Sequence, residues 1–205
     1  MRDRHFSESN NDELIKFCRG TGLRRNELTA LKGKDLLTRT QIEAGIARLK
    51  SIPEEMRTPL ESKRLEILKD AGMFDAEYFT HVRSGKGGRE RMSPIIGKHA
   101  EQIIERMKNT PAEEKVWQYV NANADIHGYR AEYATAIYKA RARDIGDIPY
   151  DRVNKGTGKR FQSDVYTCRK DEAGKKLDKA AMLICSKALG HNRVSVVADN
   201  YIRGL

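Results

Sequence analysis

Apolar residues recur at helical spacing along most of this chain, and this periodicity constrains its fold more than any other feature. Near the N-terminus, Asn10 and Glu13 are three positions apart, as in a capping box, and four apolar residues follow at helical spacing: Leu14, Ile15, Phe17 and Cys18. Gly20 and Gly22 then form a Gly-x-Gly break. We therefore expect a first helix that begins near Asn10 and ends at this break.

The same periodicity predicts several further helices. A weaker pattern over residues 41–70 is divided by Pro53 and Pro59, because proline interrupts a helix, and Pro111 closes a clearer one. The expected helices start near residue 24, fall within 41–70, and cover about 100–107, 127–142, 179–189 and 193–202.

Strand signals are few and come in pairs. Residues 78–83 and 89–95 flank the turn SGKGG at 84–88, which predicts a β-hairpin. A second hairpin is expected from 163–168 and 175–177, on either side of DEAG. The predicted fold class is therefore α+β, mainly helical, with a small antiparallel sheet.

Length and charge narrow the class of protein. The chain has 205 residues, which suits a single domain with a hydrophobic core. It carries 39 Lys and Arg against 29 Asp and Glu, and this net charge of +10 favours a polyanionic partner, or else marks an ordinary basic globular protein. No run approaches the roughly 18 apolar residues of a membrane span, and MRDRHFSES has no apolar signal segment.

Cysteine usage indicates the compartment. The chain has three cysteines and no C-x-x-C pair, which argues against a disulfide scaffold and favours a reducing cytosol. Cys18 and Cys185 lie among apolar residues, where we expect them to be small core residues.

The first hairpin turn carries Lys86 in the run Gly85-Lys86-Gly87-Gly88-Arg89-Glu90-Arg91. A lysine between glycines on a turn can reach into a groove without steric hindrance. The alternative is an ordinary solvated turn. The run is not a nucleotide-binding P-loop, because the pattern G-x-x-x-x-G-K-[ST] is absent.

A second candidate is the pair His127 and Arg130, which share a helix face because they are three residues apart. They lead a buried stripe, where cationic groups need an anionic partner. A phosphate would serve, since arginine binds it in a bidentate way and histidine adds a donor or a base. The alternative is a structural arginine paired with Glu27 or Glu132.

Three further candidates lie near the two ends of the chain. Arg24 follows the first glycine break, and Glu27, three residues on, is placed to orient it; the alternative is a paired surface Arg–Glu. Gly190 is expected to cap a helix with His191 directly after it. Tyr201 lies on the expected last helix, where the alternative is an aromatic core anchor.

The order of these elements is more specific than any one of them. T-G-L-R-x-x-E-L, the Gly-Lys-Gly hairpin, H-x-x-R, L-G-H and a tyrosine near the C-terminus follow one another between about residues 12 and 202. In this respect the chain resembles the catalytic domain of the tyrosine recombinase (phage-type integrase) family, and in particular integrases of phages and integrative mobile elements.

The resemblance implies that Tyr201 is the nucleophile that attacks a scissile DNA phosphate. A tyrosine hydroxyl keeps its proton at neutral pH, so the attack needs an acceptor, and the resemblance implies His127 as this acceptor or as an orienting donor. Lys86 would protonate the departing 5′-oxygen. The products would be a 3′-phosphotyrosyl link and a 5′-hydroxyl, and a partner 5′-hydroxyl could reverse the step and join new DNA.

The remaining implied residues act on the phosphate. Arg24 and Arg130 would hold its two non-bridging oxygens and neutralise the charge that grows in the transition state. His191 would add a hydrogen bond there, and Glu27 would support Arg24. Neither a metal nor a nucleotide cofactor is implied.

The resemblance also sets expectations for partners and organisation. It implies double-stranded DNA carrying attachment sites, a homotetramer on paired sites, an accessory DNA-bending protein, no membrane, and a bacterial cytoplasm with the nucleoid. The chain is expected to be one catalytic domain, 1–205, without the family's N-terminal core-binding domain and with insertions at 41–75 and 143–178. Two alternatives are a non-catalytic DNA-binding fragment of an integrase and a type IB topoisomerase-like enzyme.

Overall fold

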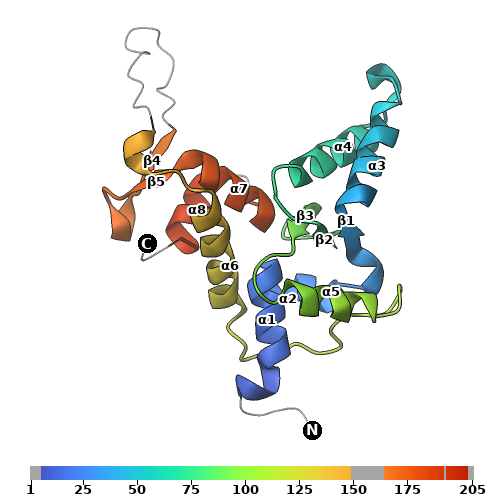
Figure 1. Cartoon of the computed structure of the whole chain (residues 1–205), viewed down its shortest axis with the longest axis horizontal. Helices are drawn as coiled ribbons and strands as arrows, with labels where there is room; N and C mark the ends of the chain where they lie inside the picture. Colours follow the sequence, from blue (N-terminus) through green and yellow to red (C-terminus); the bar gives the residue numbers. More distant parts are fainter. Residues whose placement is uncertain (1–5, 149–163, 192, 203–205) are drawn as a thin grey trace.

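The computed structural model describes residues 6–148, 164–191 and 193–202 (Figure 1). Within these ranges the protein is an α+β domain in which helices predominate, as the periodicity predicts. The helices are α1 (Asp12–Thr21), α2 (Arg25–Ala30), α3 (Arg39–Lys50), α4 (Pro59–Ala71), α5 (Ala100–Lys108), α6 (Ile126–Arg141), α7 (Lys179–Leu189) and α8 (Val194–Asn200).

The start of α1 differs from the expected capping box. Asn10 lies inside a short 3-10 turn, Ser9–Asn11, and α1 begins after it at Asp12. The N-cap is therefore Asn11, whose side chain makes no capping hydrogen bond. The prediction of a capping box at Asn10 and Glu13 is wrong because the preceding turn is already helical.

Two small antiparallel sheets accompany the helices. The first has the order β1-β2-β3, formed by β1 (Leu36–Thr38), β2 (Tyr78–Val82) and β3 (Arg91–Pro94). The second pairs β4 (Val165–Thr167) with β5 (Lys176–Asp178). Both predicted hairpins are confirmed. The three-residue strand β1, which pairs with β2, was not expected from the sequence.

The helices form groups around the first sheet (Figure 1). α1, α2 and α5 lie together near the N-terminus, whereas α6, α7 and α8 lie together on another side of the molecule, and α3 and α4 form a pair above the sheet. α6 links the first two groups because it packs against both α1 and α7, and α7 also contacts β3. The ends of α1, α6 and α7 thus meet beside β3, where the candidate site lies.

The two segments expected to be insertions contain regular structure. Residues 41–75 hold most of α3 and all of α4, which pack against each other, and Leu49, Leu65 and Leu68 are buried in the main hydrophobic core. Within 143–178, the described residues include β4 and β5, whereas 149–163 lie outside the described residues.

The cysteines behave as core residues. Cys18, Cys168 and Cys185 are all described, buried and free of disulfide bonds. Burial raises the pKa of the Cys18 and Cys185 thiols to about 12, so both remain protonated at neutral pH. None of the helices in the described ranges combines the length and the apolar character that crossing a membrane would require.

Candidate functional site

Five of the six residues singled out as catalytic meet in one place. An open pocket of about 360 Å³ lies between the start of α2, the start of α6 and the end of α8. His191 lies behind this pocket, in contact with Arg24 and Tyr201. The pocket is lined by Arg24, Arg25, Ala124, Asp125, Ile126, His127, Arg130 and Tyr201.

The position of Arg24 in the site depends on the glycine that ends α1. α1 ends at Gly22, whose φ of +59° is in the left-handed region, and the backbone N–H of Gly22 donates to Cys18. The chain then turns so that Arg24 becomes the N-cap of α2, and Glu27 Oε2 accepts from the backbone N–H of Arg24 at 2.8 Å. A Cβ on Gly22 would overlap the ring of Tyr133. The Gly-Leu-Arg order therefore brings Arg24 to the pocket edge.

Gly22→Ala is expected to destabilise the protein by roughly 2 to 4 kcal/mol, through the left-handed backbone and the overlap with Tyr133. The measurement is the free energy of unfolding in urea. Gly87→Ala is the matched control: Gly87 also has a positive φ, of +74°, but a Cβ added there would meet no atom within 4 Å. It is expected to cost about 1 kcal/mol. Equal losses in the two variants would contradict the role given to the Tyr133 contact.

Arg130 is the most deeply buried cation of the site, with 2% of its surface exposed. Its Nη1 donates to the carbonyl of Gly22, its Nη2 to the carbonyl of Leu189, and its Nε to the Tyr201 hydroxyl at 3.4 Å. A guanidinium has five N–H donors, so two remain for a ligand. Burial, followed by the charges of Arg91 and Arg24, lowers the pKa of Arg130 to about 10, so it still carries its charge at neutral pH.

Among the described residues, Arg130 forms no salt bridge with Glu27 or Glu132, the two partners that the structural alternative required. Glu132 pairs instead with Arg19, whose Nε lies 2.6 Å from Glu132 Oε2. Glu27 receives its hydrogen bonds from Arg24 and Arg91. Arg130 is therefore held by backbone carbonyls, which leave its charge uncompensated by any direct salt bridge within the described ranges.

Tyr201 lines the pocket from the end of α8. The sequence predicts the last helix over 193–202, but α8 ends at Asn200, so Tyr201 follows the helix rather than lying within it, although its N–H still donates to the carbonyl of Val197 at 2.9 Å. Its ring centroid is 5.1 Å from that of His127 and 5.3 Å from that of His191. The ring packs in the core, as an aromatic anchor would, but its hydroxyl faces Arg130.

His127 completes the pocket from α6. It is exposed at the second position of α6, and the Asp125 side chain caps this helix by accepting from Gly128 at 2.9 Å. The imidazole therefore reaches solvent on one side and the Tyr201 ring on the other.

His191 follows the helix cap that the sequence predicts. Gly190 ends α7 in the left-handed conformation, with φ of +69°, and His191 comes directly after it. Arg24 Nη2 lies 3.3 Å from His191 Nε2. Since a guanidinium only donates, Nε2 accepts here and the proton of the neutral ring lies on Nδ1. Burial and then the charges of Arg130 and Arg24 lower the pKa of His191 to about 4, so the ring is neutral at pH 7.

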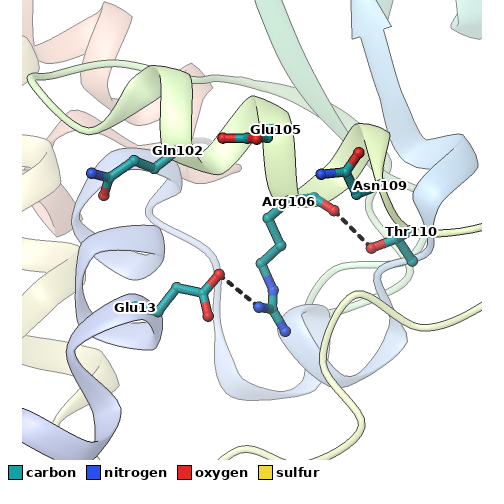
Figure 2. A pocket seen from close by; sticks show the side chains of 6 residues that line it. All are labelled: Glu13, Gln102, Glu105, Arg106, Asn109 and Thr110. Carbon is teal, nitrogen blue, oxygen red and sulfur yellow. Dashed lines mark hydrogen bonds and ion pairs between the residues drawn. The ribbon is translucent and has the colours of Figure 1, made fainter.

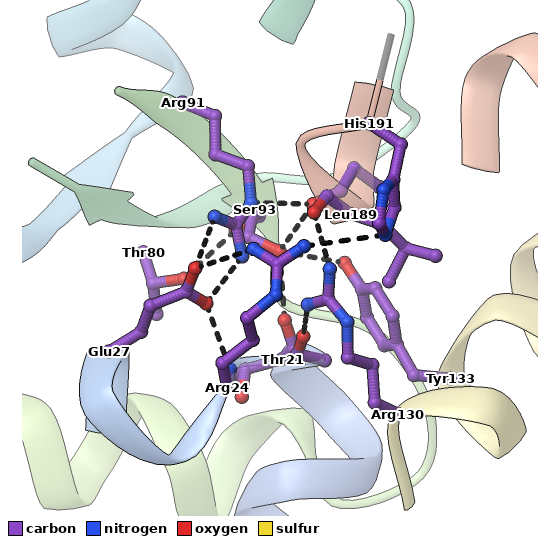
Figure 3. Close-up of polar contacts among 12 residues, drawn as sticks. Thr21, Arg24, Glu27, Thr80, Arg91, Ser93, Arg130, Tyr133, Leu189 and His191 are labelled. Atoms are coloured by element: carbon purple, nitrogen blue, oxygen red, sulfur yellow. Dashed lines mark hydrogen bonds and ion pairs between the residues drawn. The ribbon is translucent and has the colours of Figure 1, made fainter. Parts of the chain in front are cut away.

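Glu27 is a buried carboxylate shared by two arginines (Figure 3). Arg91 donates to both of its oxygens, at 2.8 and 2.7 Å, and Arg24 Nη1 donates to Oε1 at 2.9 Å. Glu27 is 5% exposed, so the alternative of a surface Arg–Glu pair is wrong. Sequence reasoning did not single out Arg91, although it is a charged residue on a strand whose four residues are all buried.

Glu27 makes the stability of the fold depend on pH. Burial acts to raise its pKa, but the hydrogen bonds and charge of Arg91, with the backbone of Arg24, lower it to about 2, from 4.5. Because the folded-state pKa is the lower one, the carboxylate stabilises the fold above pH 4.5 and loses this effect as the pH falls through 2. The lowering of the Glu27 pKa from 4.5 to about 2 corresponds to about 3 kcal/mol of folding stability at neutral pH.

Glu27→Gln is expected to remove about 3 kcal/mol of the fall in unfolding free energy that the wild type shows between about pH 5 and pH 2. Urea unfolding at a series of pH values measures it. Glu132→Gln is the control, because its exposed ion pair with Arg19 should change stability by less than about 1 kcal/mol. Parallel acid slopes for wild type and Glu27→Gln would show that Glu27 is not the titrating group.

Lys86 does not join the other five residues. It lies at the tip of the β2–β3 hairpin, where its side chain is exposed and has no hydrogen bond or ion pair to the described residues. Gly87 and Gly88 have positive φ angles, and the turn is closed by the N–H of Gly85, which donates to Arg89 at 2.7 Å. The hairpin thus presents Lys86 to solvent.

A larger open hollow of about 570 Å³ lies elsewhere, between α1 and α5 (Figure 2). Its polar side chains are in part already paired: Arg106 donates to Glu13 at 2.6 Å, and Thr110 to the carbonyl of Arg106 at 2.8 Å. It shares no residue with the Tyr201 pocket. Among the side chains that the structure describes, no three His, Cys, Asp or Glu are grouped so as to hold a metal.

Comparison of the chain with protein-family models, curated proteins and solved structures finds no match. The functional assignment therefore depends on the residues of the pocket and on their geometry.

Proposed function

We propose that this chain is the catalytic domain of a site-specific DNA recombinase of the tyrosine class, with the corresponding fold. It cleaves and rejoins DNA strands through a 3′-phosphotyrosyl intermediate. The observation that carries the proposal is the setting of Tyr201: its hydroxyl is 3.4 Å from Arg130 Nε, and its ring contacts two histidines, His127 and His191, at a pocket open to solvent.

The charge of the pocket suits a phosphodiester. Arg24 and Arg130 both line it, and Glu27 is the carboxylate that Arg24 shares with Arg91, so positive charge is in excess. Arg130 has two N–H donors left, and Arg24 has three after its contacts with Glu27 and His191. These donors would bind the non-bridging oxygens and stabilise the charge that develops on them in the transition state.

Side chains of this chain can account for every bond and proton transfer in the covalent step. The Tyr201 oxygen forms a bond to phosphorus, the bond from phosphorus to the 5′-oxygen breaks, and the phenolic proton passes to His127. Neutral His191 donates a hydrogen bond to the phosphate from Nδ1–H, or from Nε2–H after a change of tautomer. The 5′-oxygen leaves as a hydroxyl after it takes a proton from Lys86, which the hairpin would bring to DNA lying across the pocket.

This proposal implies double-stranded DNA as substrate and partner, and a homotetramer on paired sites. The net charge of +10 supports the DNA partner, because neutralising phosphates releases counterions and makes binding salt-dependent.

The test is formation of a denaturation-resistant protein–DNA adduct on a pool of labelled duplexes with randomised sequence. A nick a few nucleotides 3′ to the randomised region lets the short 5′-hydroxyl fragment dissociate, which traps the adduct. The expected result is an adduct whose peptide, identified by mass spectrometry, contains Tyr201. Salt-sensitive binding without an adduct would favour a non-catalytic DNA-binding fragment, and relaxation of a supercoiled plasmid without strand exchange would favour a topoisomerase.

A further inference from the structure

A buried arginine that the proposed chemistry does not use enters the site from β3. Arg91 is 5% exposed and donates from Nη1 and Nη2 to the two oxygens of Glu27. Its Nε donates to the carbonyl of Ala188, in the last turn of α7, at 2.9 Å. Figure 3 shows Arg91 beside Glu27 and Arg24, with His191 nearby. One side chain thus joins β3, α2 and α7.

Because Glu27 Oε2 accepts from Arg91 Nη2 and from the backbone N–H of Arg24, only Oε1 accepts from the Arg24 side chain. Arg24 uses Nη1 for Glu27 Oε1, and its Nη2 is turned to His191. A carboxylate without Arg91 would be free to accept two parallel hydrogen bonds from Arg24, the geometry that guanidinium and carboxylate groups prefer. Arg24 would then be drawn away from the pocket.

Arg91 also packs against the loop that carries His191. A Cβ on Gly190 would approach Arg91 Cδ to 2.9 Å, so the backbone at this left-handed glycine lies directly on the arginine side chain. The contacts of Arg91 with Gly190 and Ala188 hold the end of α7, and with it the residue that follows Gly190, at a constant distance from β3.

We propose that Arg91 is a positioning residue: by occupying both oxygens of Glu27 and the Ala188 carbonyl, it keeps Arg24 turned toward His191 and available to a phosphate. This inference rests on the proposed function of the pocket. A purely electrostatic role makes a different prediction, since lysine would then replace Arg91 without loss. An ammonium group cannot reproduce the bidentate contact together with the bond to Ala188.

The experiment compares Arg91→Lys, Arg91→Met and the double variant Arg91→Met/Glu27→Gln. Binding of inorganic phosphate is followed by NMR through the side-chain signals of Arg24 and His191, and adduct formation is measured on the nicked pool. Arg83→Lys is the matched control, because Arg83 follows β2 of the same hairpin and pairs with buried Asp35 at 2.6 Å. Circular dichroism confirms that each variant is folded.

We expect Arg91→Lys to weaken phosphate binding and to slow adduct formation at least tenfold, and Arg91→Met to do so at least a hundredfold. Adding Glu27→Gln to Arg91→Met should recover at least tenfold, because the carboxylate that competes for Arg24 has gone. A merely structural role predicts no such recovery. Arg83→Lys should stay within threefold of wild type in both measurements.

The outcomes separate the two proposals. Phosphate binding that follows this order, in a wild type that forms no adduct, would support the role of Arg91 and overturn the proposed recombinase activity. An adduct in the wild type with Arg91→Lys within threefold of it would overturn the role of Arg91 alone. Absence of both phosphate binding and adduct in the wild type would overturn both.

Discussion

Tyr201→Phe is expected to abolish the covalent protein–DNA adduct completely, because the substitution removes the one oxygen that would bond to phosphorus. The phenyl ring keeps its contacts with His127 and His191, so the pocket keeps its shape. The loss of one hydrogen bond from Arg130 should lower the unfolding free energy by only about 1 kcal/mol. DNA affinity, measured by gel shift over a range of salt concentrations, should stay within about twofold.

Other tyrosines serve as controls for this prediction. Tyr119→Phe, at a tyrosine that is 46% exposed, should form adduct at the wild-type rate. Tyr133 and Tyr138 are poor substitutes as nucleophiles: the hydroxyl of the first donates to Pro94 at 2.8 Å, and that of the second accepts from the N–H of Asp178 at 2.9 Å, both in buried surroundings. An adduct that persists in Tyr201→Phe would show that the nucleophile has been wrongly assigned.

Arg130→Ala is expected to slow adduct formation by a factor of about 10²–10³ or more, the scale of losing a donor that stabilises transition-state charge. It also leaves the carbonyls of Gly22 and Leu189 unpaired in a buried place, at about 1 to 3 kcal/mol each. Arg130→Lys separates the two effects, because it retains the charge and can satisfy one carbonyl. We expect it to be folded and still at least tenfold slow.

Single-turnover rates on the nicked pool and urea unfolding of the same preparations measure these two effects. Arg19→Ala is the control, since Arg19 contacts α6 only through the exposed Glu132 and the ring of Tyr129 among the described residues. It should leave the rate unchanged. Arg130→Lys with wild-type kinetics would remove Arg130 from the proposed chemistry and leave it as a structural residue.

Local chemistry made much of this fold predictable. The glycine-rich turns at 84–88 and around DEAG lie between strands that do pair, because such turns and β-compatible flanks act over a few residues. The capping box at Asn10 failed because the structure continues a helical turn ahead of it. β1 could not be predicted because three residues are too few to show an alternation of apolar and polar side chains. Its pairing with β2 identifies it as a strand.

The candidate site was predictable to the extent that its residues lie in recognisable local patterns. Arg24 after a glycine turn, and His191 after a glycine cap, have local signals, and the structure brings both into contact. Arg91 has no such signal, because its value depends on Glu27 and Ala188, 64 and 97 residues away along the chain. The separation of Lys86 from the other site residues also has no local signal, because it depends on where the β2–β3 hairpin lies in the folded domain.

The helices, the two hairpins, the left-handed glycine at Gly190 and the chemical types present could all be derived from the sequence alone, because periodicity and backbone preference act between neighbours. Which of these groups meet depended on long-range packing. Contact of α6 with both α1 and α7 brings Arg130 to the carbonyls of Gly22 and Leu189, and Tyr201 to Arg130. The low pKa values also depend on long-range packing: burial lowers the pKa of His191, and the contacts with Arg91 and Arg24 lower that of Glu27 against the effect of its burial, and both environments exist only after the chain has folded.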